Sequence, residues 1–310
     1  MVGNPPEMAI ETRNLSKRFK DLQAVDSLYM KVRKGEIYGF LGPNGAGKTT
    51  TIKMIMGLVR PTRGNVLING RRVDDGSIEH RREMGYLPEQ VAFYRNLTPV
   101  QTLNFFCELK GVDKSVVKTL IEDVGLTDAI ERKVGSYSKG MVQLLGIAQA
   151  MIGNPSIYIL DEPMVGLDAR WVKVTRDKIR RLNRQGATVM LSSHILSEVQ
   201  TLCDRVAIID EGRLLTEDTV SNLSKRLHIM PQLEILIPGL GGRIPEAVFA
   251  IRGVETADAE GDRLLVTCDA DVRLEVISAL KEAGIDIRDF RTIEPALEDA
   301  FVKMIADGGE

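Results

Sequence analysis

The 310-residue chain lacks any run of about 18 apolar residues, the length with which an α-helix crosses a bilayer. Its first residues lack the cationic and apolar parts of a signal peptide. The three cysteines, Cys107, Cys203 and Cys268, are scattered without metal-ligand spacing, so we expect idle thiols in a reducing cytosol. A net charge of −2 gives no global argument for a nucleic-acid partner. Any role at a membrane is therefore expected to need another chain.

What the sequence does contain is the alternation of an α/β domain, which we expect over residues 8–228. Short apolar strands alternate with helical stretches, a pattern typical of a mostly parallel core sheet. Two compact apolar runs predict central strands buried on both faces, and two earlier segments predict an antiparallel β edge. These are Ile37–Leu41 and Ile157–Leu160, and Ala9–Asn14 and Ala24–Val32. Helical spacing over about residues 98–152 predicts a helical subdomain inserted in this core.

A second, smaller α+β unit is expected over residues 232–310. Its segments read as strand, helix, hairpin, helix and strand, an order that is ferredoxin-like. We expect Asp271 to cap the second helix, Gly284 to end it, and the last strand to cover Ile285–Phe290. A final helix is expected over Pro295–Ile305. About 75 residues make only a small core, so we expect this accessory unit to rest on the main domain or on a partner.

The most specific motif is a phosphate-binding loop. Residues 42–49 match G-x-x-x-x-G-K-[ST] without a mismatch, after an expected strand and before an expected helix over Thr49–Gly57. The glycines let backbone N–H groups converge on a phosphate, and the helix N-terminus adds positive potential. Lys48 is expected to reach the β- and γ-phosphates, and the Thr49 hydroxyl to ligate Mg²⁺. By itself this loop does not distinguish kinase, GTPase, helicase and transporter ATPase.

A second candidate site is the apolar strand 157–160, which ends in Asp161 and Glu162. An aspartate in that position can hold Mg²⁺ opposite Thr49. The next carboxylate can orient or deprotonate an attacking water, and general-base help is worth about 10²–10⁴-fold in rate. A strand-end acidic pair is weak evidence when it stands alone, because such pairs are common in solvated turns.

Three further motifs make the pattern specific. Ser136-Tyr137-Ser138-Lys139-Gly140-Met141 precedes the acidic strand, Val165-Gly166-Leu167-Asp168 follows it, and His194 follows the expected strand Ala187–Leu191. The five motifs in this order resemble an ABC-type ATPase domain, and the resemblance covers roughly residues 8–227. It implies the P-loop NTPase fold with an ABC-type helical subdomain, and ATP hydrolysis.

The resemblance also implies a role for each matching residue. Glu162 would be the general base, His194 would contact the γ-phosphate, and Lys48 would act on the phosphates. Mg²⁺ would be held by Thr49 and Asp161, with Glu89 as a further candidate. ATP would contact Phe19, the loop Gly42, Pro43, Asn44, Gly45, Ala46, Gly47, Lys48 and Thr49, the following Thr50, Glu89 or Gln90, Ser138, Gly140 and Asp168.

Two departures from the family pattern affect these assignments. The family signature is usually Leu-Ser-Gly-Gly-Gln, whereas Lys139 and Met141 stand at two of its positions here. This variant is similar to one subgroup of exporters. Glu89 stands where the family usually has glutamine, with Gln90 next to it, so either residue could serve that position.

The resemblance implies two kinds of partner. One chain carries one phosphate loop and one signature, so we expect a head-to-tail homodimer, or a pair with a related ATPase subunit, around two Mg-ATP. A separate integral membrane permease would be driven from the cytoplasmic face, where this chain would be peripheral. The segment Glu89–Thr98, with Phe93 and Tyr94, would receive the permease, although these aromatics could simply pack the insert.

The tail Ile293–Phe301 resembles ATPases that serve exporters of the ABC-2 type for drugs, antibiotics or polymers. One alternative is an ATPase for copper-site maturation of nitrous oxide reductase, suggested by Val91–Tyr94 and Tyr137–Met141. A soluble ABC ATPase acting on nucleic acid or ribosomes is disfavoured by the short insert and the single cassette. A non-hydrolysing nucleotide switch is disfavoured by Glu162. We expect no nucleic-acid partner.

Overall fold

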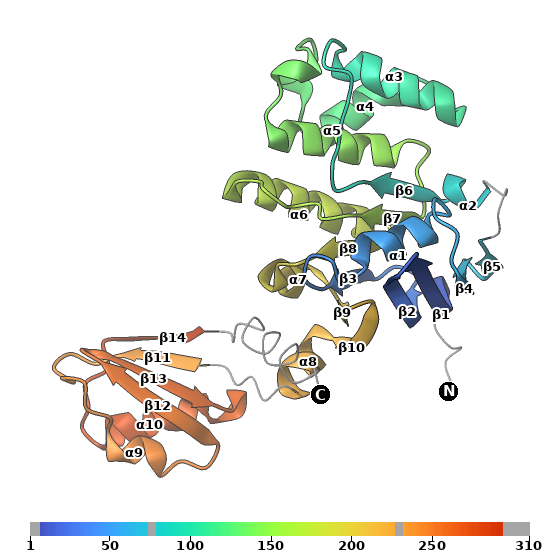
Figure 1. The fold of residues 1–310 in the computed structure, drawn as a ribbon. Coiled ribbons are helices and arrows are strands. Elements are labelled where there is room, and N and C mark those ends of the chain that lie inside the picture. The colour runs from blue at the N-terminus through green and yellow to red at the C-terminus, as the bar shows by residue number, and fades with distance from the viewer. Residues whose placement is uncertain (1–6, 74–78, 227–231, 294–310) are drawn as a thin grey trace, which may run out of the picture. The chain divides into compact units, whose positions relative to one another are not determined.

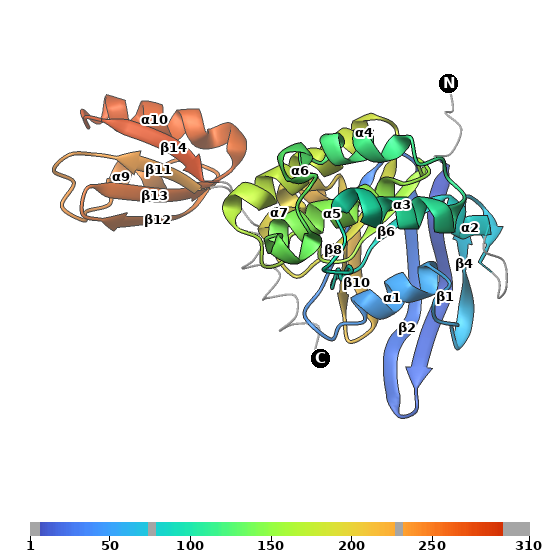
Figure 2. The same ribbon diagram turned by 90° about the horizontal axis from the view of Figure 1, so that it is seen from above.

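The computed structural model describes residues 7–73, 79–226 and 232–293. The chain divides into two compact units, Met1–Val220 and Ser221–Glu310. No helix within the described ranges is long and apolar enough to span a membrane. Figure 1 shows the elements in order along the chain, and Figure 2 gives the view from above.

The core of the first unit is a six-stranded sheet of order β10-β9-β3-β8-β7-β6. The strands β9, β3, β8, β7 and β6 run parallel, whereas β10 pairs antiparallel with β9. Their bounds are Ile37–Leu41 (β3), Met84–Leu87 (β6), Ile157–Leu160 (β7), Thr188–Ser193 (β8), Arg205–Asp210 (β9) and Arg213–Thr219 (β10). Every residue of β3, β7 and β8 is buried, which confirms the central strands predicted from the apolar runs.

A separate four-stranded sheet has the order β2-β1-β4-β5 and confirms the predicted antiparallel edge. Its strands are Met8–Phe19 (β1), Leu22–Arg33 (β2), Arg63–Ile68 (β4) and Arg71–Arg72 (β5). Helix α1 (Lys48–Ile55) contributes Ile52, Met54 and Ile55 to one apolar core with residues of both sheets. Because α1 packs against both sheets, the loop before it is held at the carboxyl end of β3, where ligands bind in open α/β sheets.

The helical insert contains α3 (Pro99–Lys110), α4 (Val116–Asp123) and α5 (Lys139–Met151), which lie together in Figure 1. Thr98 caps α3 in a capping box with Gln101, and Gly111 ends the helix at a positive φ. The described residues of this unit also form the α-helices α2 (Glu79–Arg82), α6 (Ala169–Arg184) and α7 (Leu196–Leu202). Helix α7 packs so closely on β3 that a Cβ at Gly39 would clash with Val199.

Helix α8 (Val220–Arg226) starts at the boundary between the two units, and the second unit has a sheet of order β12-β13-β11-β14. Its elements are β11 (Gln232–Leu236), α9 (Glu246–Phe249), β12 (Val254–Glu260), β13 (Arg263–Cys268), α10 (Arg273–Glu282) and β14 (Asp289–Ile293). All strand pairs are antiparallel, and together with the chain order this confirms the ferredoxin-like topology.

Two local predictions in this unit were wrong. Asp271 does not cap the helix, because it lies in a 3-10 turn over Ala270–Val272 and the N-cap of α10 is Val272. The last strand starts at Asp289, not Ile285, because Ile285 and Ile287 pack against the apolar core before the chain pairs with β11. The expected helix over Pro295–Ile305 lies outside the described residues.

Candidate active site

The loop Gly42–Gly47 joins β3 to α1 and is shaped by glycines. Gly45 and Gly47 have φ values of 89° and 99°, in the left-handed region that favours glycine. A Cβ at Gly47 would also clash with the carbonyl oxygen of Ala24 on β2. The loop therefore needs glycine for both its backbone conformation and its close contact with the second sheet, and it leads directly into the N-terminus of α1.

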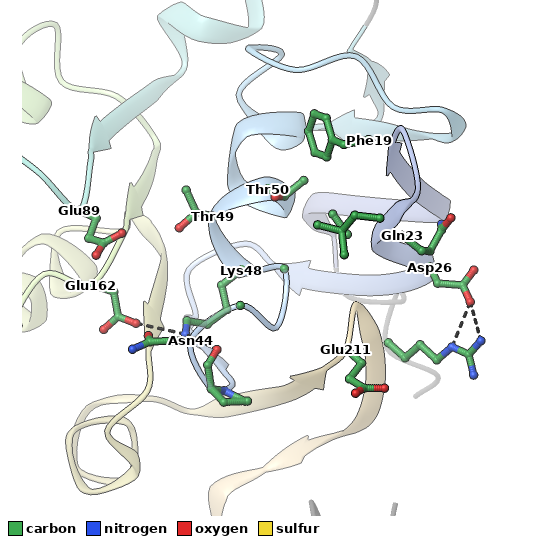
Figure 3. Close-up of a pocket in the computed structure, with 16 residues that line it drawn as sticks. Phe19, Gln23, Asp26, Asn44, Lys48, Thr49, Thr50, Glu89, Glu162 and Glu211 are labelled. Carbon is green, nitrogen blue, oxygen red and sulfur yellow. Dashed lines mark hydrogen bonds and ion pairs between the residues drawn. The ribbon is translucent and has the colours of Figure 1, made fainter. Parts of the chain in front are cut away.

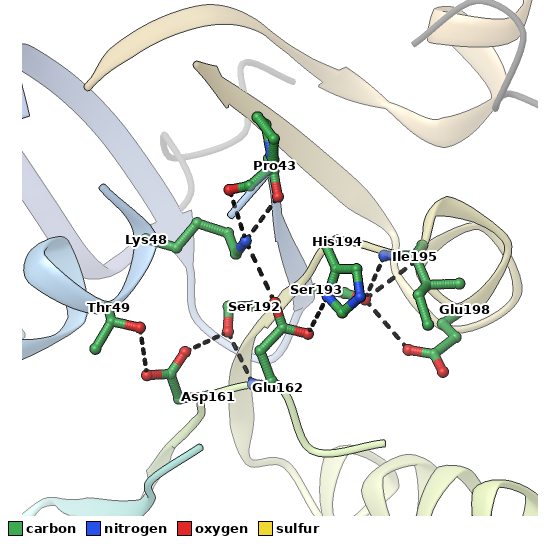
Figure 4. Close-up of polar contacts among 11 residues, drawn as sticks. Pro43, Lys48, Thr49, Asp161, Glu162, Ser192, Ser193, His194, Ile195 and Glu198 are labelled. Carbon is green, nitrogen blue, oxygen red and sulfur yellow. Dashed lines mark hydrogen bonds and ion pairs between the residues drawn. The ribbon is translucent and has the colours of Figure 1, made fainter. Parts of the chain in front are cut away.

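Lys48, the first residue of α1, turns its side chain back over this loop. Its Nζ donates hydrogen bonds to the carbonyl oxygens of Gly42 (2.6 Å) and Pro43 (3.1 Å) and lies 3.3 Å from Oε1 of Glu162. The side chain is only 7% exposed, so the ammonium is desolvated and depends on these oxygens. Figure 4 shows the lysine between the loop and the acidic end of β7.

Asp161 follows β7 and is fully buried. Its Oδ2 accepts a hydrogen bond of 3.0 Å from the Thr49 hydroxyl, and its Oδ1 accepts one of 2.6 Å from the Ser192 hydroxyl on β8. The strands β7 and β8 are parallel neighbours, so their carboxyl ends meet at one edge of the sheet. Thr49 and Asp161, which were predicted to hold the same Mg²⁺ from two separate motifs, are thus in direct contact (Figure 4).

Glu162 is held between two cationic or potentially cationic groups. Its Oε1 faces Lys48, and its Oε2 lies 3.0 Å from Nδ1 of His194. Its backbone N–H donates to the Ser192 hydroxyl (2.9 Å), and its φ of 50° is uncommon for a residue with a side chain. Such strained backbone persists only where the surroundings enforce it, and here the enforced conformation aims a buried carboxylate at the lysine.

The end of β8 next to His194 is held by hydrogen bonds to residues in and before α7. The Ser193 hydroxyl accepts a hydrogen bond from the backbone N–H of Ile195 (2.9 Å) and donates to Oε2 of Glu198 (3.2 Å). Burial raises the pKa of the Glu198 carboxyl above its ordinary value, and the charge of Glu162 acts in the same direction, whereas the Ser193 hydrogen bond opposes them. His194 lies between the Glu162 carboxylate, which it contacts, and the Glu198 carboxyl on α7 (Figure 4).

A cavity of about 960 Å³ opens above these groups (Figure 3). At one end it is lined by the phosphate loop, Lys48, Thr49, Thr50, Glu89 and Glu162. The other end is formed by Phe19, Leu22, Gln23, Ala24 and Asp26 of β1 and β2, by Glu211 of the β9–β10 turn and by Arg213 at the start of β10. This volume suits a nucleotide-sized ligand.

Of the predicted contact residues, some line the cavity and others do not. The lining contains Phe19, Pro43, Asn44, Gly45, Gly47, Lys48, Thr49, Thr50, Glu89 and Glu162. Gly42, Ala46, Asp161 and His194 lie beside it in the loop or behind the lining side chains. Gln90, Ser138, Gly140 and Asp168 are outside the lining.

Comparisons with known proteins show the family of this chain. A family model described as "ABC transporter" matches residues 25–165. The bacitracin transport ATP-binding protein BcrA of Bacillus licheniformis is 37% identical over 301 residues, which cover 96% of this chain and 98% of that protein. The doxorubicin resistance ATP-binding protein DrrA of Mycobacterium tuberculosis is 32% identical over 321 residues, covering 98% of this chain and 96% of that protein.

A solved structure described as the ATP-binding subunit of an ABC transporter has a TM-score of 0.65 and 31% identity, and covers 71% of this chain and 93% of that chain. This chain belongs to the ATP-binding subunits of ABC transporters. It is therefore an ATP-binding, ATP-hydrolysing subunit with a P-loop ABC ATPase fold. The resemblance inferred from the five motifs is confirmed.

The signature of this ABC subunit lies at the N-terminus of α5. Ser138 is the N-cap, and its hydroxyl accepts a hydrogen bond from the Met141 N–H (3.3 Å). Gly140 is covered by the Trp171 ring, so that an added Cβ would clash with it. Asp168 similarly caps α6 by accepting from the Trp171 N–H (3.1 Å). The two caps are therefore joined by one tryptophan, and Ser138 itself is exposed.

Several residues of the site were not predicted. Ser192 bridges Asp161 and the Glu162 backbone, and its only sequence signal is a polar residue after the apolar run 189–191, two positions before His194. Leu22, Gln23, Asp26, Glu211 and Arg213 line the end of the cavity away from the phosphate loop. Their segments are more than 180 residues apart in sequence, so no local pattern brings them together.

Proposed function

We propose that this chain binds Mg-ATP in the described cavity and hydrolyses it within a head-to-tail dimer to drive a separate membrane permease. The main support for this proposal is the buried Glu162 carboxylate, which is held between Lys48 and His194 beside the phosphate loop. All residues invoked for the reaction belong to the first unit, so the second unit is accessory to it.

The nucleotide phosphates would lie along the glycine loop, with the Lys48 ammonium on the β- and γ-phosphates. The loop N–H groups and the N-terminus of α1 favour anionic groups there. Phe19 is 45% exposed, which leaves its ring free to stack on the base. The Lys17 ammonium lies over one face of this ring, 4.8 Å from its centroid, so the base would stack on the other face.

The donor set at the end of β7 fits a magnesium ion. The Thr49 hydroxyl and the Asp161 carboxylate are hard oxygen ligands already in contact, and Glu89 lines the same part of the cavity, which favours it over Gln90 for that position. The described ranges contain no group of three or more metal-ligating side chains, and Mg²⁺ needs none, because it usually takes one or two carboxylates with phosphates and water. Bound there, the ion would neutralise charge on the phosphates.

Catalysis requires the buried ion pair to rearrange. When phosphates attract the Lys48 ammonium, Glu162 loses that partner and can orient a water or accept its proton. His194, in contact with the same carboxylate, would then reach the γ-phosphate. In the described arrangement the Glu162 carboxylate is paired with the Lys48 ammonium. We propose that this ion pair keeps Glu162 from acting as a base until a nucleotide separates the two groups.

A second copy of the chain, or a related ATPase subunit, would complete the site. Ser138 and Gly140 lie outside the cavity of their own chain, and both are near the N-terminal end of α5, where a phosphate would be stabilised. We propose that they contact the γ-phosphate bound by the partner, with Asp168 at the same interface. Hydrolysis then removes ligands that hold the closed dimer together.

The permease would dock beside an aromatic cluster between the core and the helical insert. Phe93 packs on Phe106 (6.0 Å between centroids), Tyr94 on Phe105 (6.4 Å), and Phe105 on Phe106 (5.4 Å). The inner pair packs the insert, whereas Tyr94 and Phe105 remain 67% and 44% exposed. Exposed aromatics of this kind mark protein interfaces. The chain would thus be peripheral on the cytoplasmic face of the membrane.

The relatives favour export as the direction of transport. Their names refer to bacitracin transport and to doxorubicin resistance, so we propose an exporter of drug-like or antibiotic-like compounds that has an ABC-2 type permease. These names do not favour the copper-maturation alternative for nitrous oxide reductase, and they do not favour action on ribosomes or nucleic acid.

The proposal is tested by affinity capture of the tagged chain from detergent-solubilised membranes, with mass spectrometry of what it retains. We expect a multi-span integral membrane protein, lost when Tyr94 and Phe105 are both changed to Ser. Tyr29→Ser is the matched control, because Tyr29 is also exposed (57%) but lies on β2. Retention of ribosomes or DNA in place of a multi-span protein would contradict the transporter assignment.

A further inference from the structure

The β9–β10 turn is attached to both walls of the nucleotide cavity. The Gly212 N–H donates to the Ala46 carbonyl of the phosphate loop (3.0 Å), and the Asp26 N–H of β2 donates to the Gly212 carbonyl (2.8 Å). A Cβ at Gly212 would lie 2.8 Å from the Ala24 carbonyl oxygen, and its φ is 78°. The turn is therefore fixed in position relative to the phosphate loop, although it is distant in sequence.

The two acidic side chains at this end of the cavity differ in their partners. Asp26 is engaged, because its Oδ2 accepts from Arg213 Nε (3.0 Å) and lies 2.9 Å from Arg213 Nη2. For Glu211, the backbone N–H donates to Oδ1 of the Asp210 side chain (3.0 Å), but no described residue makes a hydrogen bond or ion pair to its carboxylate. Glu211 is thus an exposed, unengaged acceptor on a turn of fixed position, and it lines the cavity (Figure 3).

The cavity has a different chemistry at each end. Its phosphate end carries Lys48 and the loop N–H groups, while Phe19 and Leu22 add apolar surface at the other end. Beside that apolar surface the unpaired charge is negative, which repels phosphate but accepts hydrogen bonds from neutral hydroxyl donors. In a nucleotide such donors are the 2′- and 3′-hydroxyls of ribose, between the base and the phosphates.

We propose that Glu211 accepts a hydrogen bond from a ribose hydroxyl of the bound nucleotide, and that it thereby makes the site select ribonucleotides over deoxyribonucleotides. The inference rests on the proposed nucleotide site and adds a specificity-determining residue to it. A carboxylate acceptor for a ribose hydroxyl is a known solution in nucleotide sites of other folds. Loss of one hydrogen bond to a charged group corresponds to about tenfold or more in affinity.

The test is calorimetric titration of the full chain with ATP, 2′-deoxy-ATP and 3′-deoxy-ATP, in EDTA so that no nucleotide is hydrolysed. Glu211→Gly is the informative variant, because the φ of 43° at this position suits glycine and the change removes the exposed side chain with its carboxylate. Asn154→Gly is the matched control, since Asn154 is also exposed with a positive φ (49°) but lies between α5 and β7. Melting curves of both variants verify folding.

The wild type and Asn154→Gly are expected to bind ATP about tenfold more tightly than at least one deoxy analogue. Glu211→Gly should bind all three nucleotides within about twofold, with its Kd for ATP raised to the value for the analogue. Tight ATP binding without sugar preference in the wild type, or a preference that survives in Glu211→Gly, would overturn the inference alone. Absence of ATP binding by the folded wild type both in EDTA and with Mg²⁺ would instead overturn the proposed nucleotide site.

Discussion

The carboxyl edge of the parallel sheet and the signature turn at the start of α5 are built in opposite ways. At the sheet edge Lys48, Asp161, Glu162 and Ser192 are all at most 7% exposed and hydrogen-bond or pair with one another. At the signature turn Ser138 is exposed, and its hydroxyl accepts a hydrogen bond from the Met141 N–H of its own helix. Buried polar groups need partners, whereas an exposed cap needs only solvent.

This difference indicates which half of the reaction a single chain can assemble. The sheet edge is complete within one chain, because β3, β7 and β8 bring its residues together. The signature residues Ser138 and Gly140 do not line the nucleotide cavity of their own chain. The phosphate that they are proposed to contact must therefore be bound by another chain. Changes at the sheet edge should therefore alter chemistry or metal binding directly, and changes at the signature should act only through association.

The largest effect is expected for Glu162→Gln. Removing the carboxylate base while keeping its shape should lower steady-state ATP turnover by about 10²–10⁴-fold without preventing ATP binding. Glu131→Gln, an exposed residue of the insert, is the control and should keep wild-type turnover. Turnover within about twofold of wild type in Glu162→Gln would mean that another group is the general base.

Ser138→Ala should come next, with a turnover loss of about 10²-fold and little change in the affinity of the monomer for ATP. The reason is that the hydroxyl is proposed to contact only the nucleotide of the other subunit. Ser136→Ala removes a nearby hydroxyl that donates to the Lys133 carbonyl, and it should be nearly silent. A large loss of monomer affinity in Ser138→Ala would place the signature beside its own nucleotide and erase the contrast.

Ser192→Ala should produce a smaller, metal-dependent defect. Without this hydroxyl Asp161 Oδ1 loses a 2.6 Å hydrogen bond and the Glu162 N–H loses its acceptor. We expect the Mg²⁺ concentration for half-maximal turnover to rise about tenfold, since an unsatisfied buried group costs about 1–3 kcal/mol. Ser193→Ala, which touches Glu198 and Ile195 but not Asp161, should leave the Mg²⁺ requirement unchanged. Equal shifts in both variants would exclude a specific role for Ser192.

The smallest effect concerns Glu198, whose pKa is raised by burial above 4.5. Folded protein binds this proton more tightly than unfolded chain, so the free energy of unfolding falls as pH rises from about 4.5 through the raised folded value. Glu198→Gln lacks this loss, so its stability relative to wild type should increase between about pH 4 and about pH 7 in urea unfolding. If the stability of Glu198→Gln relative to wild type is constant or decreases over this range, the pKa of Glu198 is not raised in the folded protein.

The sequence predicted those parts of the site that are contiguous along the chain. The loop 42–49 and the pair Asp161-Glu162 carry their own strand and helix context, so their contact through Thr49 could be foreseen. The antiparallel edge, the helical insert and the ferredoxin-like order were also correct, because apolar periodicity and glycine punctuation directly reflect buried strands and helix ends.

What could not be predicted depends on tertiary packing. Ser192 looks like any polar residue near a strand end until β7 and β8 are paired. Glu211 and Asp26 meet at the cavity only because the β9–β10 turn hydrogen-bonds to β2 and to the phosphate loop. In the second unit, a 3-10 turn displaced the helix start from Asp271, which local capping preference alone does not reveal.

The most direct test of the account is the mass of Glu162→Gln in solution, measured by light scattering with and without Mg-ATP. If one chain carries half of each site, the variant should have the chain mass of 34.3 kDa without nucleotide and twice that mass with it. Addition of Ser138→Ala to the same variant should prevent the doubling. A protein that stays at 34.3 kDa while ATP is bound would contradict a site shared between two copies of this chain.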